Sequence, residues 1–197
     1  MLQPLLFAIT NLGDSAVTGT LSLGLFAYLL AQREKKAALA LAVAVGMATL
    51  TIFLGKLALY TRCDNAPLFW NLASPSGHTA ISIALYGMFA VLVSSAQTGR
   101  YRLYPYFAAA PLVTLIALSR LFLHLHSTGD VVAGGIVGLA CLGAGRFLMR
   151  GEKVSCRWPP FAFIALILFI GLFGLHFPAE RLINLLSAYL RDRIRLC

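Results

Sequence analysis

Two short stretches of the sequence place histidines beside residues that suit anion binding. The first is Ser74–Thr79, in which Pro75 suits the first position of a helix and Gly77 lets a ligand approach the backbone closely. The unpaired amides of such a helix N-terminus attract anions. Ser76 adds a hydroxyl donor, and His78 adds a group that titrates near neutral pH. The alternative is that the stretch is only a helix cap.

The second stretch runs from Ser119 to Asp130. A helix that starts near His126 would place His126 and Asp130 one turn apart on the same face. The carboxylate could then accept a hydrogen bond from one ring nitrogen and leave the other basic, as in nucleophile and general-base pairs. Arg120 offers forked donors that match phosphate oxygens. The alternative is a structural ion pair among Arg120, Asp130 and a histidine.

A metal site at the second stretch is the less favoured interpretation. His124 and His126 have a spacing that can bind zinc, but the sequence has no CxxC pair to complete a ligand set. We therefore expect His124 to pack or to support the site rather than to bind a metal.

The elements that must position these residues are predicted to be membrane helices. Of the 197 residues 59% are hydrophobic, and the mean hydropathy is +0.83. We predict an all-α integral membrane bundle with about six transmembrane helices, because a span needs about 20 apolar residues. The predicted spans are Ser15–Ala31, Ala37–Leu59, Gly77–Ala96, Pro105–Leu123, Asp130–Leu148 and Pro160–Pro178.

The whole chain, residues 1–197, is predicted to form one membrane-embedded domain. Residues 1–12 are expected to form an interfacial helix rather than a signal peptide, with Asp14 or Ser15 as the N-cap of the first span. Residues 179–197 have apolar positions at helical spacing and several arginines, which predicts an amphipathic helix on the outer leaflet. A miscounted span is the alternative explanation of this basic tail.

The net charge of +9 is arranged as in a membrane protein, and no basic patch with interleaved aromatic residues suggests a nucleic-acid partner. By the positive-inside rule the side that carries most basic loop residues is cytoplasmic. Those residues are Arg33, Lys35, Lys36, Arg100, Arg102, Arg146, Arg150, Lys153 and Arg157. The connections 60–76 and 123–129 and both termini then face the periplasm or exterior, as expected for a protein of a bacterial inner membrane.

Several ionisable residues are predicted at the external ends of the spans. Such residues are costly near membrane depth and are functional candidates for that reason. They are Lys56, Arg62, His78, Arg120, His124, His126 and Asp130. Because two spans separate the two external connections, the chain returns to the same face and these residues can converge.

The four cysteines indicate little. Cys141 and Cys156 are expected to be free thiols, since they fall inside a span and in a cytoplasmic loop. Cys63 and Cys197 would both be external, so a disulfide between them stays open.

The joint pattern resembles the type 2 phosphatidic acid phosphatase superfamily. The pattern consists of Pro75-Ser76-Gly77-His78, then Ser119-Arg120, five residues, His126, three residues and Asp130. This superfamily includes the lipid phosphate phosphatases and shares its site with vanadium haloperoxidases and glucose-6-phosphatase. Its first motif, Lys, six residues and Arg-Pro, matches only in part. Lys56 and Arg62 are separated by five residues, and Cys63 stands where proline is expected.

The resemblance implies dephosphorylation of a lipid phosphate or lipid pyrophosphate without a metal or other cofactor. His126 would form a phosphohistidine, Asp130 would orient it, and His78 would protonate the leaving oxygen and then activate water. The implied ligands of the phosphoryl oxygens are Arg120, Ser76, the Gly77 amide, Lys56 and Arg62. Lys56 could instead be a snorkelling residue at the end of its span.

The substrate and the fate of the phosphoryl group stay open. Candidate substrates are polyprenyl pyrophosphate, phosphatidylglycerol phosphate, phosphatidic acid and phosphorylated glycolipids. A phosphotransferase would use the same residues, and a non-catalytic lipid-binding or transport protein could retain the fold. A haloperoxidase is a weaker alternative, since it would need bound vanadate. The sequence does not indicate the oligomeric state.

Overall fold

The computed structural model describes residues 2–61, 71–155, 171 and 179–194, which form helices and turns and include no strand. The helix N-terminal to the first span is α1 (Leu2–Asn11), and α8 (Ala179–Ile194) forms the tail. Between them lie α2 (Ser15–Ala31), α3 (Lys35–Tyr60), α4 (Gly77–Ser95), the 3₁₀ helix η2 (Gly99–Leu103), α5 (Tyr104–Phe122) and α6 (Thr128–Leu148).

Five helical stretches of the described residues are long and apolar enough to cross a membrane. They are Gln3–Ala31, Lys35–Tyr60, Gly77–Ser95, Gly99–Phe122 and Thr128–Leu148. The predicted helical membrane bundle is therefore confirmed, and the first five predicted spans agree with α2 to α6 within about two residues. The sixth predicted span, Pro160–Pro178, lies outside the described residues except for residue 171.

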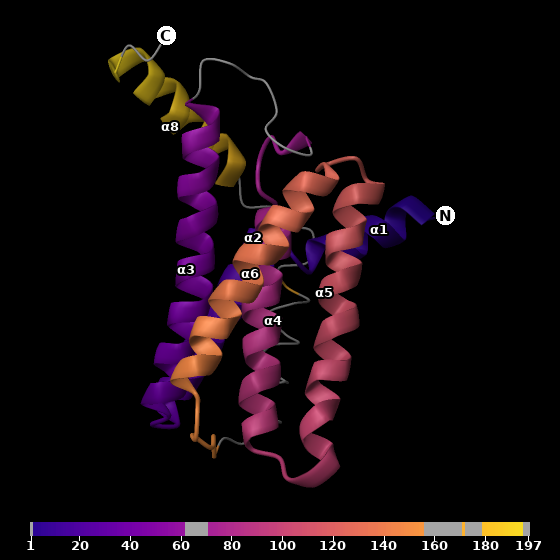
Figure 1. The fold of residues 1–197 in the computed structure, drawn as a ribbon, viewed down its shortest axis with the longest axis vertical. Coiled ribbons are helices and arrows are strands. Elements are labelled where there is room, and N and C mark those ends of the chain that lie inside the picture. The colour runs from indigo at the N-terminus through magenta and orange to yellow at the C-terminus, as the bar shows by residue number, and fades with distance from the viewer. Residues whose placement is uncertain (1, 62–70, 156–170, 172–178, 195–197) are drawn as a thin grey trace.

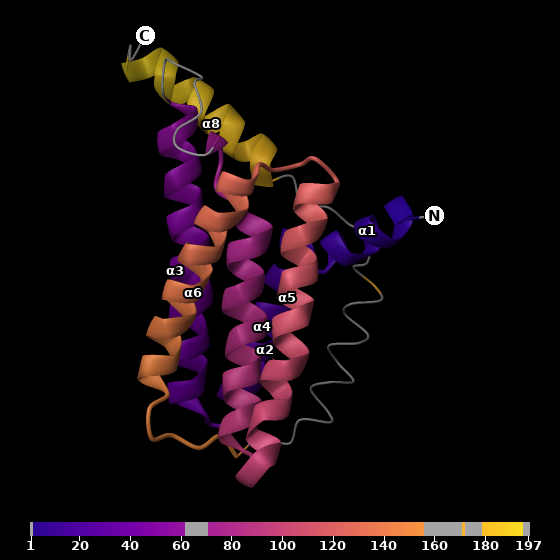
Figure 2. The same ribbon diagram turned by 45° about the vertical axis from the view of Figure 1, so that its right-hand side comes forward.

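Helix α4 occupies the middle of the bundle. It packs against α3, α5 and α6, while α2 packs against α3. Figures 1 and 2 show α3, α4, α5 and α6 running along the long axis of the molecule, with α1 lying crosswise and α8 crossing one end of α3. Leu29, Leu41, Met88 and Leu92 belong to the buried apolar core between these helices.

Glycines on one face of α6 allow it to approach α4 very closely. A side chain at Gly134 would collide with the carbonyl oxygen of Ser76, and one at Gly138 would lie 2.8 Å from the carbonyl oxygen of Ala80. The first turns of α4 and α6 therefore meet at the same end of the bundle. These are the turns that follow the two stretches with candidate site residues.

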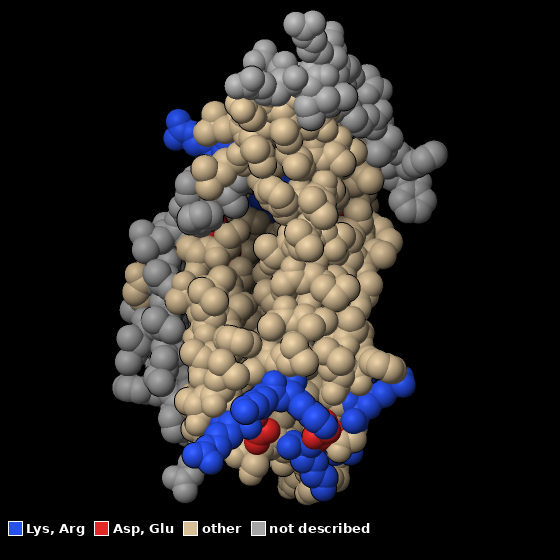
Figure 3. Space-filling model, turned by 90° about the vertical axis from the view of Figure 1, so that its left-hand side faces the viewer, with Lys and Arg blue, Asp and Glu red and all other residues tan. Residues whose placement is uncertain are grey.

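Most of the basic side chains that the structure describes lie at the opposite end of the bundle. Figure 3 shows Lys and Arg gathered there around a few acidic groups. Lys36 Nζ lies 2.5 Å from Glu152 Oε1, and the Ser155 amide donates to Glu34 Oε1 at 2.8 Å. The connections after α2 and α6 thus lie side by side, as the charge pattern predicts. Their cytoplasmic location stays a prediction.

Candidate active site

Helix α4 begins at Gly77, with Ser76 as its N-cap. The Ser76 hydroxyl accepts hydrogen bonds from the Thr79 amide at 3.4 Å and from the Thr79 hydroxyl at 3.0 Å. Ser76 is fully buried. The prediction that Pro75 occupies the first helical position is wrong, because Ser76 supplies the cap and Pro75 precedes it. A contact between the Ser76 hydroxyl and phosphate stays a prediction.

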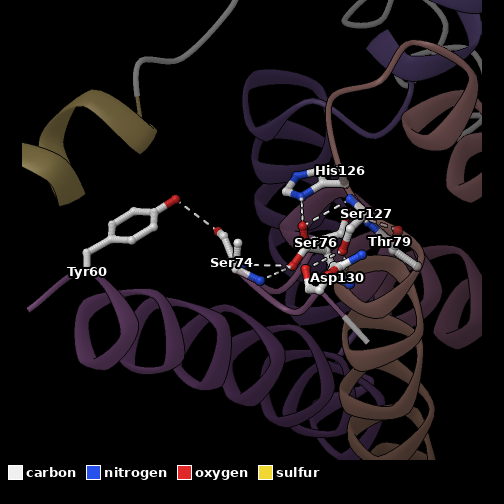
Figure 4. A network of polar contacts seen from close by, with 9 residues as sticks. Tyr60, Ser74, Ser76, Thr79, His126, Ser127 and Asp130 are labelled. Carbon is white, nitrogen blue, oxygen red and sulfur yellow. Dashed lines mark hydrogen bonds and ion pairs between the residues drawn. The ribbon is translucent and has the colours of Figure 1, made fainter. Parts of the chain in front are cut away.

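Helix α6 begins at Thr128, two residues after His126. Ser127 and Asp130 form a capping box in which each side chain accepts a hydrogen bond from the other's amide. His126 Nδ1 lies 3.3 Å from Asp130 Oδ2 (Figure 4). The predicted contact between this imidazole and carboxylate is present, although the helix starts later than the contact seemed to require.

Asp130 also fastens the two candidate stretches together. Its Oδ1 accepts hydrogen bonds from the amides of Ala73 at 2.9 Å and Ser74 at 2.8 Å. Its main-chain carbonyl accepts from the amide of Ser76 at 3.0 Å. Figure 4 shows this network around Asp130, with the Ser74 hydroxyl accepting from Tyr60 at 2.9 Å. One carboxylate therefore orients His126 and holds the loop that leads into α4.

A cavity of about 510 Å³ lies at this end of the bundle. Its charged or titratable lining residues, among those that the structure describes, are Asp14, Lys56, His78, Arg120 and Arg181. Its other walls include apolar residues of α1, α3, α4 and α8. The described lining residues come from α1, α2 and its cap, α3, α4, α5, the connection after α5, and α8. The cavity therefore forms only when distant parts of the chain have packed together. Cationic and apolar side chains thus line the same cavity.

His126 adjoins this cavity without lining it. Its side chain is only 6% exposed, whereas Arg120 in the last turn of α5 and Leu125 on the connection before α6 do line the cavity. Burial lowers the pKa of His126 below its ordinary value of 6.5, and the positive charges of Arg120 and Lys56 act in the same direction. The hydrogen bond to Asp130 opposes them. The net effect favours the neutral imidazole, which is the nucleophilic form.

Of the two residues of the partly matched first motif, the structure describes Lys56 but not Arg62. Lys56 is 3% exposed and lines the cavity. It is therefore not a lysine that snorkels out to the interface. Arg62 lies outside the described residues, and its role stays a prediction. Together, Lys56 and Arg120 bring two cationic side chains to the cavity from α3 and α5.

The N-terminal segment contributes to the site in a way that motif analysis missed. Arg120 Nη1 donates to Thr10 Oγ1 at 3.1 Å, and Asp14 Oδ2 lies 3.9 Å from His78 Nε2. Asp14 is also the N-cap of α2, as predicted, and accepts from the Ala16 amide. The sequence could have indicated this, because the predicted first and third spans start on the same side of the membrane, which places Asp14 and His78 at the same end of the bundle.

His124 was expected to pack or to support the site, but it does not pack inside the protein. His124 is exposed and has a left-handed backbone conformation with a φ of 53°. Among the described residues no three His, Cys, Asp or Glu side chains are grouped to hold a metal ion. Cys141 is a buried free thiol, as expected. The other three cysteines, at 63, 156 and 197, lie outside the part of the chain that the structure describes.

Comparison with known proteins points to one family. A family model described as the PAP2 superfamily matches residues 57–152. Lipid phosphate phosphatase delta of Arabidopsis thaliana is 30% identical over 103 residues, which cover 47% of this chain and 25% of that protein. The chain thus aligns with about a quarter of the length of this relative. No solved structure matches the chain. Residues 57–152, which contain both of the fully matched motifs, are thus similar to the PAP2 superfamily.

Proposed function

We propose that this protein removes phosphate from a lipid phosphate or lipid pyrophosphate through a phosphohistidine, without a metal ion. The observation that carries the proposal is the contact between His126 and Asp130. Asp130 also accepts hydrogen bonds from the loop before α4, and the first turn of α4 contains His78. The name of the similar Arabidopsis protein, a lipid phosphate phosphatase, supports the substrate class.

In the first step, the neutral ring of His126 attacks phosphorus through Nε2, since Nδ1 faces Asp130. A P–N bond forms as the bond from phosphorus to the lipid oxygen breaks, and its electron pair leaves with that oxygen. His78 donates the proton that the oxygen takes up. Asp130 stays ionised and stabilises the positive charge that develops on His126.

Charge on the phosphoryl oxygens is stabilised by groups already at the cavity. Arg120 and Lys56 are cationic, and the amide of Gly77 belongs to the helix N-terminus of α4. Ser76 and Arg62 complete the proposed set. Positive side chains of this kind perform the task that magnesium ions perform in other phosphoryl-transfer enzymes.

In the second step, His78 takes a proton from a water molecule as that water attacks the phosphohistidine. The P–N bond breaks, its electron pair returns to His126, and inorganic phosphate leaves. His78 is then protonated again and His126 is neutral, so the cycle can restart. A lipid acceptor in place of water would turn the same step into phosphotransfer.

The cavity walls suit a substrate that stays in the bilayer. Ile52, Phe53 and Ile81 line the cavity beside its charged residues. A headgroup could therefore reach the site while its chains remain in hydrocarbon. We place this end of the bundle at the periplasmic or external face, because the basic end is expected to be cytoplasmic.

Phosphate release by purified protein in detergent tests the proposal. The panel contains polyprenyl pyrophosphate, phosphatidylglycerol phosphate, phosphatidic acid and a phosphorylated glycolipid, each assayed with EDTA. We expect release from at least one lipid and a loss of at least about a thousandfold in His126→Ala. His124→Asn is the matched control, since asparagine tolerates the left-handed backbone at this exposed position.

Three outcomes would contradict the proposal. Undiminished release by His126→Ala would exclude His126 as the nucleophile. Loss of activity with EDTA that added metal restores would exclude the metal-independent mechanism. No release from any lipid of the panel would favour a lipid-binding or transport protein.

A further inference from the structure

A second contact between a histidine and an aspartate lies in the cavity. Asp14 Oδ2 is 3.9 Å from His78 Nε2, and both residues line the cavity. This distance suits an ion pair but is too long for a hydrogen bond. Asp14 is 7% exposed, so water screens its charge only in part. It also lies outside the matched segment, residues 57–152.

The position of Asp14 relative to His78 is fixed by contacts on both sides. Asp14 Oδ1 accepts from the Ala16 amide at 2.8 Å, and its carbonyl accepts from the Thr18 amide at 2.8 Å. On α4, Tyr86 donates to the carbonyl of Leu12 at 2.7 Å and so holds the turn before α2 against the helix that carries His78.

Gly13 lets this turn lie against the His78 ring. A Cβ atom at Gly13 would be 2.7 Å from Ile116 Cγ2 and 3.3 Å from His78 Cδ2. Any side chain at this position would push the turn away from α4 and α5. The approach of Asp14 to His78 therefore depends on a glycine immediately before it.

The charges around His78 indicate how Asp14 could act on it. Among the residues that the structure describes, the other charged ones that line the cavity are Lys56, Arg120 and Arg181, and all three are positive. Positive neighbours disfavour a protonated imidazole, whereas a nearby carboxylate favours it. A proton donor in this cavity needs an opposing negative charge, and Asp14 supplies one at ion-pair distance.

We infer that Asp14 is a positioning residue for the proton donor: its carboxylate stabilises the imidazolium form of His78. This inference rests on the proposed function. As the bond from phosphorus to the lipid oxygen breaks, the proton passes from His78 to that oxygen, and Asp14 stays ionised throughout. Loss of the carboxylate should therefore slow the reaction most for substrates whose leaving oxygen must be protonated.

Two substrates with different leaving groups test the inference. An alkyl lipid phosphate releases an alkoxide that must be protonated, whereas p-nitrophenyl phosphate releases a stable phenolate that needs no proton. The measured quantity is kcat/KM, which reports the first phosphoryl transfer. General acid catalysis contributes about a hundredfold or more. We expect Asp14→Asn to lower kcat/KM about ten- to hundredfold for the alkyl phosphate and less than about threefold for p-nitrophenyl phosphate.

Two variants separate the charge of Asp14 from its role as the cap of α2. Asparagine keeps a good N-cap and removes the charge, whereas glutamate keeps the charge and caps poorly. If Asp14 acts through His78, Asp14→Glu hydrolyses the alkyl phosphate faster than Asp14→Asn does. If Asp14 is only a cap, the order is reversed, and that result overturns the inference.

The outcomes distinguish this inference from the proposed function. A wild-type protein inactive on every lipid of the panel and on p-nitrophenyl phosphate contradicts the proposed function and the inference with it. An active wild type whose Asp14→Asn variant loses equal factors on both substrates overturns the inference alone. Asp14→Ser, which also caps and lacks the charge, replaces Asp14→Asn if the latter does not yield folded protein, and the same selective loss is expected.

Discussion

At the residue scale, the proposed mechanism makes opposite demands on two histidines. His126 must be neutral to attack phosphorus, and its burial together with the charges of Arg120 and Lys56 favours that state. His78 must carry a proton to release the lipid, and Asp14 lies at ion-pair distance from it. Two imidazoles of the same intrinsic acidity can thus serve different steps because their surroundings differ.

The protonation of His126 can be measured directly. NMR titration of ring-labelled histidines in detergent should give a midpoint below 6.5 for the signal that His126→Asn removes. Because a protonated ring cannot attack, activity should fall as pH falls through this midpoint, and the nucleophile should stay neutral above it. A midpoint above 6.5 would mean that Asp130 outweighs burial, contrary to the account.

Lys56 should contribute to the low pKa of His126. Its positive charge disfavours the imidazolium, so Lys56→Met should raise the pKa of His126 and move the NMR midpoint to higher pH. Lys36→Met, at the opposite basic end, is the control and should leave the midpoint unchanged. Equal midpoints in Lys56→Met and wild type would contradict the proximity of the two charges.

The residue scale also shows what sequence could and could not supply. The contact of His126 with Asp130 follows from a spacing of four positions near a helix start, so it was predictable. The bonds from Asp130 to the amides of Ala73 and Ser74 were not, because they depend on how α6 meets the preceding loop. The contact of Asp14 with His78 requires the packing of α2 against α4, which no local pattern specifies.

At the element scale, the site exists because α4 and α6 start at the same end and pack closely. Hydropathy was sufficient to predict the described spans almost to the residue, since long apolar runs end at charged or capping residues. The predicted span beginning at Gly77 agrees with the start of α4, but the placement of Pro75 in the first helical position was wrong, because Ser76 is the N-cap. Span lengths also gave no indication that α8 would reach the cavity through Arg181.

The close approach of α6 to α4 yields a prediction with a matched control. A methyl group at Gly134 would collide with the Ser76 carbonyl, so Gly134→Ala should separate the two helix starts and lower both thermal stability and phosphate release. Gly135→Ala adds the same methyl group where nothing lies within 4 Å. Its melting temperature and activity should equal or exceed those of wild type. Equal effects of the two substitutions would contradict this packing.

The tail helix α8 should affect substrate affinity more than turnover. Arg181 lines the cavity but is exposed, and exposed ion pairs contribute at most about 1 kcal/mol. Arg181→Gln should therefore raise KM for a lipid phosphate about two- to fivefold with little change in kcat. Arg181→Lys should restore most of the affinity. A loss in kcat with unchanged KM would contradict this role of the tail.

At the scale of the whole molecule, the bundle has a basic end and an end that carries the candidate site. Figure 3 shows the basic end, where Lys36 pairs with Glu152. The positions of the basic residues along the chain predicted these two different ends, because every second connection between spans must lie on the same side of the membrane. Sequence did not indicate that the N-terminal segment and α8 would both border one cavity, since that follows from the packing of the complete bundle.

The predicted orientation can be tested by cysteine labelling in whole cells. In a background without native cysteines, Thr128→Cys reports the site end and Lys153→Cys reports the basic end, and both positions are exposed. A membrane-impermeant maleimide should label Thr128→Cys in intact cells and Lys153→Cys only after permeabilisation. The reverse pattern would place the site at the cytoplasmic face.

Trapping the covalent intermediate tests the central claim most directly. Wild type, His78→Ala and His126→Ala are each mixed with a lipid pyrophosphate, because the leaving group of such a substrate depends less on a proton donor. The reactions are quenched in alkali, and the protein is digested for mass spectrometry. The account predicts a phosphoryl group on His126, more of it in His78→Ala, and none in His126→Ala. Phosphate release by wild type with the phosphoryl group on another residue, or with no phosphorylated protein at any time point, would contradict it.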